Sequence, residues 1–204
     1  ENMLSKIKHI KNDIKGKLPN IYLLHGDFTD DEMNGLYNHP KVKAHVTFTH
    51  GEGFGRPLLE ATMVGLPVIA SAWSGQMDFL SEEHSMLLSG ELRKVPKSQV
   101  WKDIIIEDSK WFYVNEQNAY NALNFCFTNY DKIKESAINL MKINRKKFTL
   151  NKMSEELDKI VTPHLNKIST QVGLKLPKLK KVNESKPQKI QLPKLKKVTS
   201  EATV

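Results

Sequence analysis

Short apolar runs alternate with amphipathic segments over roughly the first 70 residues of this 204-residue chain. The expected strands are residues 21–26, 42–49 and 66–71, and the expected helices are residues 3–15, 30–37 and 57–64. Strands that alternate with helices through short links form a parallel sheet with helices on both faces. The sequence therefore predicts an α/β fold.

The helix boundaries carry their own signals. Thr29 and Glu32 stand three residues apart at the start of a helical pattern, as in a capping box. Pro57 suits the first position of a helix, because its missing N–H would have no partner there. Gly65 suits the end of the same helix. The helix from Pro57 therefore begins directly after a glycine-rich turn.

Ligands of parallel sheets bind beyond the carboxyl ends of the strands. Residues 50–56 and 72–78 both follow expected strands, so we expect these two loops to line one crevice.

The rest of the pattern is less regular. Residues 86–88 and 109–114 are interpreted as strands or extended segments, and residues 91–108, which have no clean period, as an inserted excursion. Helical patterns follow at about residues 116–130, 132–148 and 151–164.

The net charge lies at the end of the chain. Residues 171–204 hold nine lysines and two glutamates, so they carry almost all of the formal net charge of +8. The heptapeptide LPKLKKV occurs there twice, at residues 176–182 and 192–198. We expect a folded domain over residues 1–168 and a flexible, disordered basic tail, rich in Lys and Pro, over residues 169–204. The tail is either a solvated extension or a bivalent motif for an acidic partner.

Composition indicates the cellular compartment of the protein. No apolar run approaches the ~20 residues of a membrane-spanning helix, and no signal peptide is recognisable. The single cysteine, Cys126, excludes an internal disulfide and is expected to be a buried thiol in a cytoplasmic protein. Because the sequence starts within a helical pattern and without methionine, we expect it to be the C-terminal portion of a longer protein.

The segment Glu52-Gly53-Phe54-Gly55-Arg56-Pro57-Leu58-Leu59-Glu60 is the most informative for function. Its two acids bracket a glycine-rich turn, where the backbone can approach a ligand closely, and the helix that follows presents N–H groups and the positive end of its dipole. Carboxylates bind hydroxyl groups and amides bind phosphate, and a nucleotide sugar carries both. The alternative is a structural loop followed by a helix glutamate, without any ligand.

Individual roles follow from these positions. Glu52 would accept a hydrogen bond from a sugar hydroxyl, and Glu60 would accept two from a vicinal diol such as ribose. The amides of residues 53–56, with those of Leu58 and Leu59, would bind phosphate, and Arg56 would either face the phosphates or lie exposed.

The same residues carry a family resemblance. Residues 52–61, with Gly65-Leu66-Pro67-Val68-Ile69-Ala70, resemble the E-x7-E signature of retaining GT-B glycosyltransferases, family 4 in particular. The resemblance covers about residues 1–165. It implies one Rossmann-like half of a GT-B fold, the C-terminal, donor-binding domain.

The resemblance also implies site residues. Glu52 matches the catalytic glutamate that contacts the donor sugar, and Glu60 matches the one that holds the ribose. A Gly-Gly-x-x-Glu loop usually follows the next strand; here it reads Ser74-Gly75-Gln76-Met77-Asp78, so Ser74 replaces a glycine and Asp78 the glutamate. The expected donor-binding residues are Gly53, Phe54, Gly55, Arg56, Leu58, Leu59, Glu60, Ser74 and Gly75.

The family works without a metal or other cofactor, and the histidines beside the motif lack the spacing of a metal site. His50 would either contact the donor or cap the preceding strand. A basic pair that neutralises the leaving diphosphate is not recognisable at residues 6–8 or 15–17, so it is expected upstream, with an N-terminal acceptor domain.

We therefore expect a retaining, metal-independent transferase that moves a hexose from a nucleoside diphosphate to an unknown hydroxyl. One alternative is a related GT-B enzyme, such as an epimerase or a phosphorylase. Another is a non-catalytic nucleotide-sugar-binding or adaptor module that acts through its basic tail.

Overall fold

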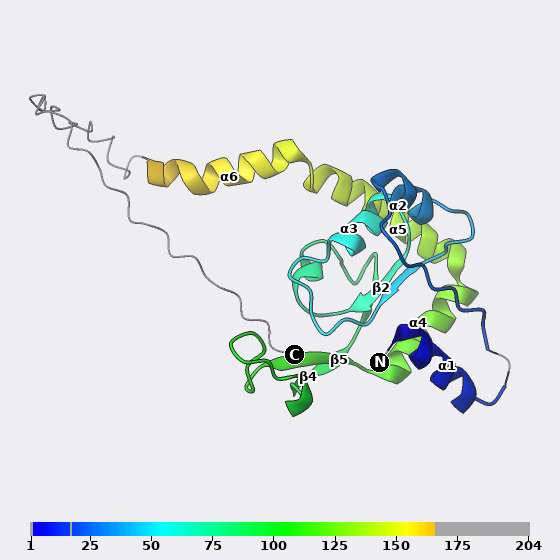
Figure 1. Cartoon of the computed structure of the whole chain (residues 1–204). Helices are drawn as coiled ribbons and strands as arrows, with labels where there is room; N and C mark the ends of the chain where they lie inside the picture. The colour runs from blue at the N-terminus through cyan, green and yellow to red at the C-terminus, as the bar shows by residue number, and fades with distance from the viewer. Residues whose placement is uncertain (1, 17, 166–204) are drawn as a thin grey trace, which may run out of the picture. The chain divides into compact units, whose positions relative to one another are not determined.

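The structure is a computed structural model that describes residues 2–16 and 18–165 (Figure 1). The chain divides into two compact units, residues 1–157 and 158–204. Of the second unit, only residues 158–165 are described. The predicted tail, both of its repeats and the predicted boundary at residue 168 lie outside the described residues.

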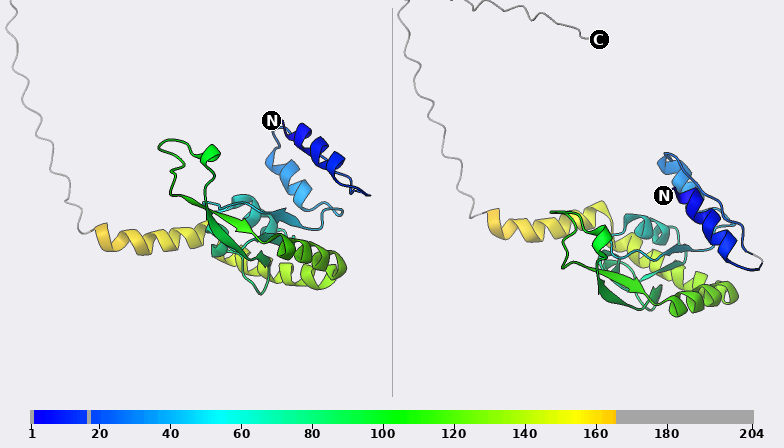
Figure 2. Two further views of the ribbon diagram at one scale, coloured as in Figure 1. Left: turned by 90° about the horizontal axis from the view of Figure 1, so that it is seen from below. Right: turned by 60° about the horizontal axis from the view of Figure 1, so that its bottom comes forward.

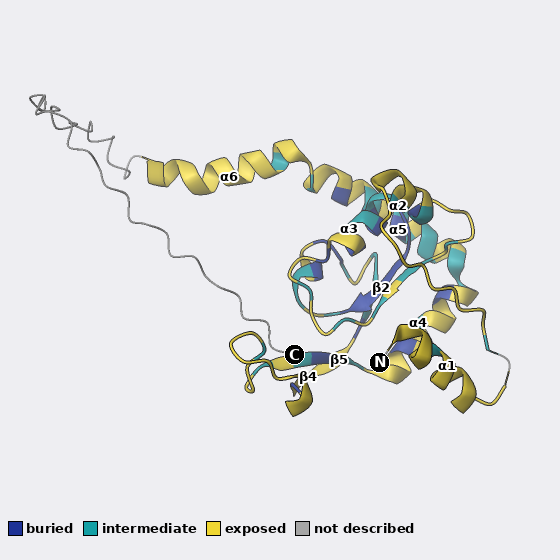
Figure 3. Cartoon of the chain, viewed as in Figure 1, coloured by how far each residue is buried: buried dark blue, intermediate teal, exposed yellow. Residues whose placement is uncertain are grey.

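A three-stranded parallel sheet forms the centre of the first unit. Its strands are β1 (His45–Thr47), β2 (Val68–Ser71) and β3 (Met86–Leu88), in the order β1-β2-β3. All four residues of the middle strand, β2, are buried, as Figure 3 shows. The predicted parallel sheet is confirmed; β1 and β2 are shorter than predicted, and β3 has the predicted bounds.

Helices cover both faces of this sheet. Val68 and Ala70 share a core cluster with residues of α2 (Asp30–Tyr37), α3 (Arg56–Met63) and α5 (Tyr130–Lys147). Ile69, which points to the opposite face, shares a second cluster with Ala119 and Cys126 of α4 (Glu116–Thr128). The predicted α/β fold is thus confirmed, and Cys126 is buried as expected.

Local signals placed several helix ends correctly. In the capping box of α2, the Glu32 N–H donates to Thr29 Oγ1 at 3.3 Å and the Thr29 N–H donates to Glu32 Oε2 at 2.8 Å. Helix α3 begins at Arg56, one residue before the predicted Pro57, because Gly55 is its N-cap. The remaining helices are α1 (Met3–Asp13) and α6 (Leu150–Leu165), in neither of which the structure buries a residue. No helix among the described residues is long and apolar enough to cross a membrane.

The strand predicted at residues 21–26 is wrong. These residues form no strand, and their side chains are exposed, Tyr22 to 81%. An apolar run becomes a strand only where a neighbouring strand pairs with it, and no hydrogen bond joins this segment to the described residues. The outer edge of β1 therefore has no strand partner there.

A two-stranded antiparallel ribbon follows the sheet. It consists of β4 (Gly90–Lys94) and β5 (Lys110–Val114), and the loop between them includes the short 3-10 helix η2 (Lys97–Gln99) (Figure 2). The predicted strand at residues 109–114 is confirmed as β5. The start of the predicted excursion at residues 91–108 is strand β4. This strand is exposed at all five positions, so no buried face imposes alternation on its sequence.

We predict that the half-buried His45 makes stability depend on pH. Burial lowers the pKa of His45 below its ordinary value, so below that value the unfolded chain binds a proton more readily than the folded chain. Stability is therefore complete above about pH 6.5, the ordinary histidine value, and falls as the pH falls below it. Urea midpoints at pH 7.5 and 5.5 should differ less in His45→Gln than in the natural chain. The control His25→Gln, at an exposed position, should keep the full difference; an unchanged difference in His45→Gln would contradict this account.

Candidate functional site

Two loops meet at the carboxyl edge of the sheet. Loop 1 (residues 48–55) follows β1 and loop 2 (residues 72–78) follows β2. The Ser74 hydroxyl donates to the Glu52 carbonyl at 2.6 Å and accepts from the Glu52 N–H at 3.1 Å. The Gly75 N–H donates to the same carbonyl at 3.0 Å. The two loops that the sequence placed at one crevice are therefore in direct contact.

The glycines of these loops differ in their surroundings. A Cβ atom on Gly75 would lie 2.2 Å from the carbonyl oxygen of Gly53, so only glycine fits where the loops cross. A Cβ atom on Gly53 would meet nothing within 4 Å. Gly75 is thus required for loop packing, whereas Gly53 leaves open space above the turn.

Gly55 ends the turn in a left-handed conformation with φ of +88° and is the N-cap of α3. Its carbonyl accepts hydrogen bonds from the N–H groups of Leu58, at 3.0 Å, and Leu59, at 3.1 Å. This corrects the expectation that these two amides are free donors, because the first turn of the helix already uses them. The N–H groups of Gly53 and Phe54 have no hydrogen-bond partner among the described residues.

The side chain of Phe54 fixes the turn from the protein side. Its ring lies 5.2 Å from the ring of Phe79 and 6.0 Å from that of Phe148, measured between centroids. The aromatic cluster therefore holds one side of the Phe54 ring, and the residue as a whole stays 40% exposed.

Glu52 lies half-buried at the start of the turn. Its backbone is held by loop 2, and its carboxylate has no ion pair or hydrogen bond within the described part of the chain. A fixed backbone with an unpaired carboxylate can accept hydrogen bonds from a bound molecule.

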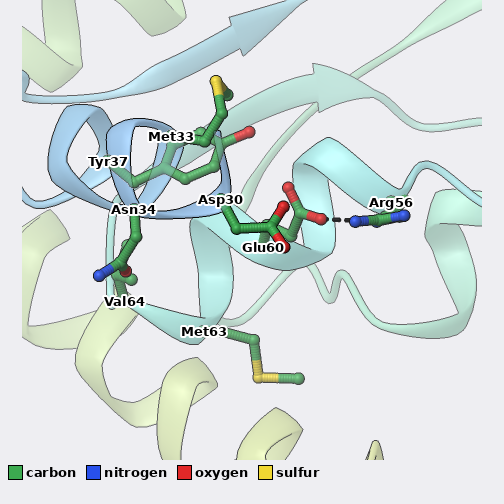
Figure 4. Close-up of a pocket in the computed structure, with 8 residues that line it drawn as sticks. All are labelled: Asp30, Met33, Asn34, Tyr37, Arg56, Glu60, Met63 and Val64. Carbon is green, nitrogen blue, oxygen red and sulfur yellow. Dashed lines mark hydrogen bonds and ion pairs between the residues drawn. The ribbon is translucent and has the colours of Figure 1, made fainter. Parts of the chain in front are cut away.

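Glu60 lies at a separate pocket of about 330 Å³ between α2 and α3 (Figure 4). Its Oε1 atom accepts a hydrogen bond from Arg56 Nε at 2.7 Å. Tyr37 of α2 lies opposite, and its pKa is raised chiefly by burial and further by the Glu60 carboxylate. The pocket is lined by Asp30, Met33, Asn34, Tyr37, Arg56, Glu60, Met63 and Val64.

The Arg56 side chain is therefore paired with the Glu60 carboxylate. Its side chain is 80% exposed, and the ion pair raises its pKa further. Of the two roles that the sequence left open for Arg56, exposure is observed, and an interaction with phosphate would require this pair to rearrange.

His50 joins the ribbon to loop 1. Its Nδ1 atom lies 2.7 Å from the carbonyl oxygen of Phe112, its own carbonyl accepts from the Phe112 N–H at 3.1 Å, and its ring stacks on Trp111 at 4.8 Å. His50 thus fastens β5 beyond the end of β1, close to the interpretation of a strand cap. Among the described residues, no three His, Cys, Asp or Glu side chains are grouped closely enough to hold a metal ion.

A protein-family model matches residues 11–108, which include β1, both loops and α3. It is the model of the glycosyl transferases of group 1. The predicted resemblance is therefore confirmed at the level of this group, over the stretch that contains the motif, which is a little under half of the chain.

Among solved structures, the chain is similar to Anabaena Alr3699/HepE, described in a crystal structure in complex with UDP and glucose. Sequence identity is 21% and the TM-score is 0.40, and the alignment covers 58% of the present chain and 26% of that chain. The present chain thus matches about a quarter of that protein's length, and so distant a likeness assigns no ligand to it. No curated protein sequence gives a significant match.

Sequence reasoning missed the surroundings of Glu60. The capping box located α2, but no local pattern shows that Tyr37 and Asn34 of α2 line the same pocket as Glu60 of α3. It also missed the stacking of His50 on Trp111. In both cases the partners are distant in sequence.

We predict that Gly75→Ala destabilises the protein by about 2 kcal/mol or more, because overpacking at a rigid contact costs about 1–3 kcal/mol. The new methyl group would overlap the Gly53 carbonyl. The matched control is Gly53→Ala, whose methyl group meets open space. Urea unfolding measures both, and equal stability of the two variants would contradict the observed crossing of the loops.

Proposed function

We propose that this chain is the nucleotide-sugar-binding part of a retaining, metal-independent glycosyltransferase that transfers a hexose. The observation that carries the proposal is the position of Glu52. Its backbone is held by loop 2 and its carboxylate is unpaired among the described residues, at the carboxyl edge of a parallel sheet. The match of residues 11–108 to the glycosyl transferases of group 1 supports the reaction class.

In this proposal, three groups of the ligand have three binding places. The donor sugar contacts Glu52. The diphosphate lies over the turn. There the N–H groups of Gly53 and Phe54, which no described residue accepts from, and the open space at Gly53 allow close approach. The positive end of the α3 dipole lies beside this turn and favours the charge that develops on the leaving diphosphate.

The ribose is assigned to Glu60, and the nucleoside to the pocket between α2 and α3. The ion pair with Arg56 orients the Glu60 carboxylate without neutralising its capacity to accept hydrogen bonds, because a carboxylate has about four acceptor positions. The apolar Met33 and Met63 side chains offer contact surface for a base. The acceptor and the basic groups for the leaving diphosphate belong, in this proposal, to a further domain outside this sequence, so residues 1–165 bind donor and turn it over poorly.

Two substitutions separate the two glutamates by calorimetry. Glu60→Gln should weaken the nucleoside diphosphate and its sugar equally, by about tenfold, because a hydrogen bond to a charged group contributes about 1.5–3 kcal/mol. Glu52→Gln should weaken only the nucleotide sugar, since the free diphosphate lacks the hexose.

The matched control is Glu82→Gln, an exposed glutamate after loop 2 that is not in the motif. It should leave both affinities unchanged. An unchanged nucleotide affinity in Glu60→Gln would contradict the ribose assignment, and equal losses of both ligands in Glu52→Gln would contradict the sugar assignment.

A further inference from the structure

Ser74 has a backbone conformation that belongs to glycine. Its φ of +78° and ψ of −158° fall in a region that is accessible almost only to glycine, because a Cβ atom is crowded there. Asp103 is the only other non-glycine residue of positive φ in the described chain, and it lies in the exposed loop of the ribbon. A strained residue at a proposed site calls for a compensating interaction.

The compensating interaction is the double hydrogen bond to Glu52. One hydroxyl both donates to the Glu52 carbonyl and accepts from the Glu52 N–H, so it holds the whole residue by its backbone. A glycine at position 74 would adopt this conformation without strain but would lack the hydroxyl.

Loop 2 is itself firmly anchored, so Ser74 is a fixed point. The fully buried Gln76 donates from Nε2 to the carbonyl and to the hydroxyl oxygen of Ser71, both at 3.0 Å, at the end of β2. The buried Asn144 of α5 donates to the carbonyl of Phe79, just beyond the loop, at 3.1 Å. In loop 1, the space above Gly53 is open.

We infer that Ser74 is a positioning residue, which fixes the backbone of Glu52 so that its carboxylate points at the donor sugar. This inference rests on the proposed function, because it takes Glu52 as the residue that contacts the sugar. It changes the role expected of Ser74, from a contact with the donor to a contact with Glu52. The strained backbone at position 74 then serves to position Glu52 and does not contribute to the stability of the fold.

The variants Ser74→Gly and Ser74→Ala separate positioning from structure. Ser74→Gly loses the hydroxyl and relieves the strain, so its Tm should stay within about 3 °C of the natural chain. Ser74→Ala loses the hydroxyl and keeps the strain, so its Tm should fall by about 5 °C. If Ser74 had only a structural role, discrimination between the nucleotide sugar and the free diphosphate would fall only in the less stable variant, Ser74→Ala.

The decisive readout is a ratio of two dissociation constants: that of the nucleoside diphosphate divided by that of the corresponding nucleoside diphosphate sugar. The probe is whichever uridine, guanosine or adenosine diphosphate sugar most stabilises the natural chain. The ratio should fall about fivefold in both variants, the effect of about one ordinary hydrogen bond, because the sugar contact weakens more than the binding of the diphosphate alone. The control Asp103→Gly relieves strain in the exposed loop of the ribbon and should leave the ratio unchanged.

A ratio that stays at the natural value in Ser74→Gly overturns the inference. A second readout needs no ligand: amide exchange of Gly75, whose N–H donates to the Glu52 carbonyl, should accelerate about tenfold when that carbonyl is released, by the effect of one such bond. If no nucleotide sugar binds the natural chain, the proposed function fails by itself. The exchange rate of the Gly75 amide then tests whether Ser74 fixes the backbone of Glu52, and an unchanged rate overturns that inference.

Discussion

Parallel pairing of β1 with β2 sets His45 opposite Val68 and Thr47 opposite Ala70, so both strands end at one edge of the sheet. Beyond that edge, the backbone N–H and C=O groups no longer form hydrogen bonds between strands. Loops 1 and 2 form hydrogen bonds with each other instead. Three hydrogen bonds join Ser74 and Gly75 to the backbone of Glu52. The position of Glu52 and the open face at Gly53 both depend on this contact.

The first turn of α3 determines which groups remain for a ligand. Because the Gly55 carbonyl uses the amides of Leu58 and Leu59, the proposed phosphate site relies on the amides of the turn before the helix. Glu60 lies at the pocket between α2 and α3, paired with Arg56. An exposed ion pair of this kind contributes little to stability, so the significance of the pair lies in how it orients the Glu60 carboxylate. The two glutamates of the motif thus lie in two distinct environments on either side of one turn.

Local signals were enough to predict much of this arrangement. The capping box at Thr29, the buried run at β2 and the glycine-rich turn before α3 each act within a few residues, so the sequence displays them directly. Features that depend on distant partners could not be predicted. Tyr37 lies opposite Glu60 only because α2 packs near α3, and residues 21–26 look like a strand but find no strand partner among the described residues. Ser74 could be recognised as a substitution for glycine, but its bonds to Glu52 required the structure.

The most direct test of the account is the thermal stability of the whole chain in the presence of a panel of nucleoside diphosphate sugars. At about a hundred times its dissociation constant, a ligand that binds only the folded state adds about 2.7 kcal/mol of stability. For a chain of this size, that corresponds to a rise in Tm of roughly 5–10 °C. The account predicts such a rise for at least one sugar nucleotide, and its loss in the double variant Glu52→Gln with Glu60→Gln. No rise with any member of the panel, or an equal rise in the double variant, would contradict it.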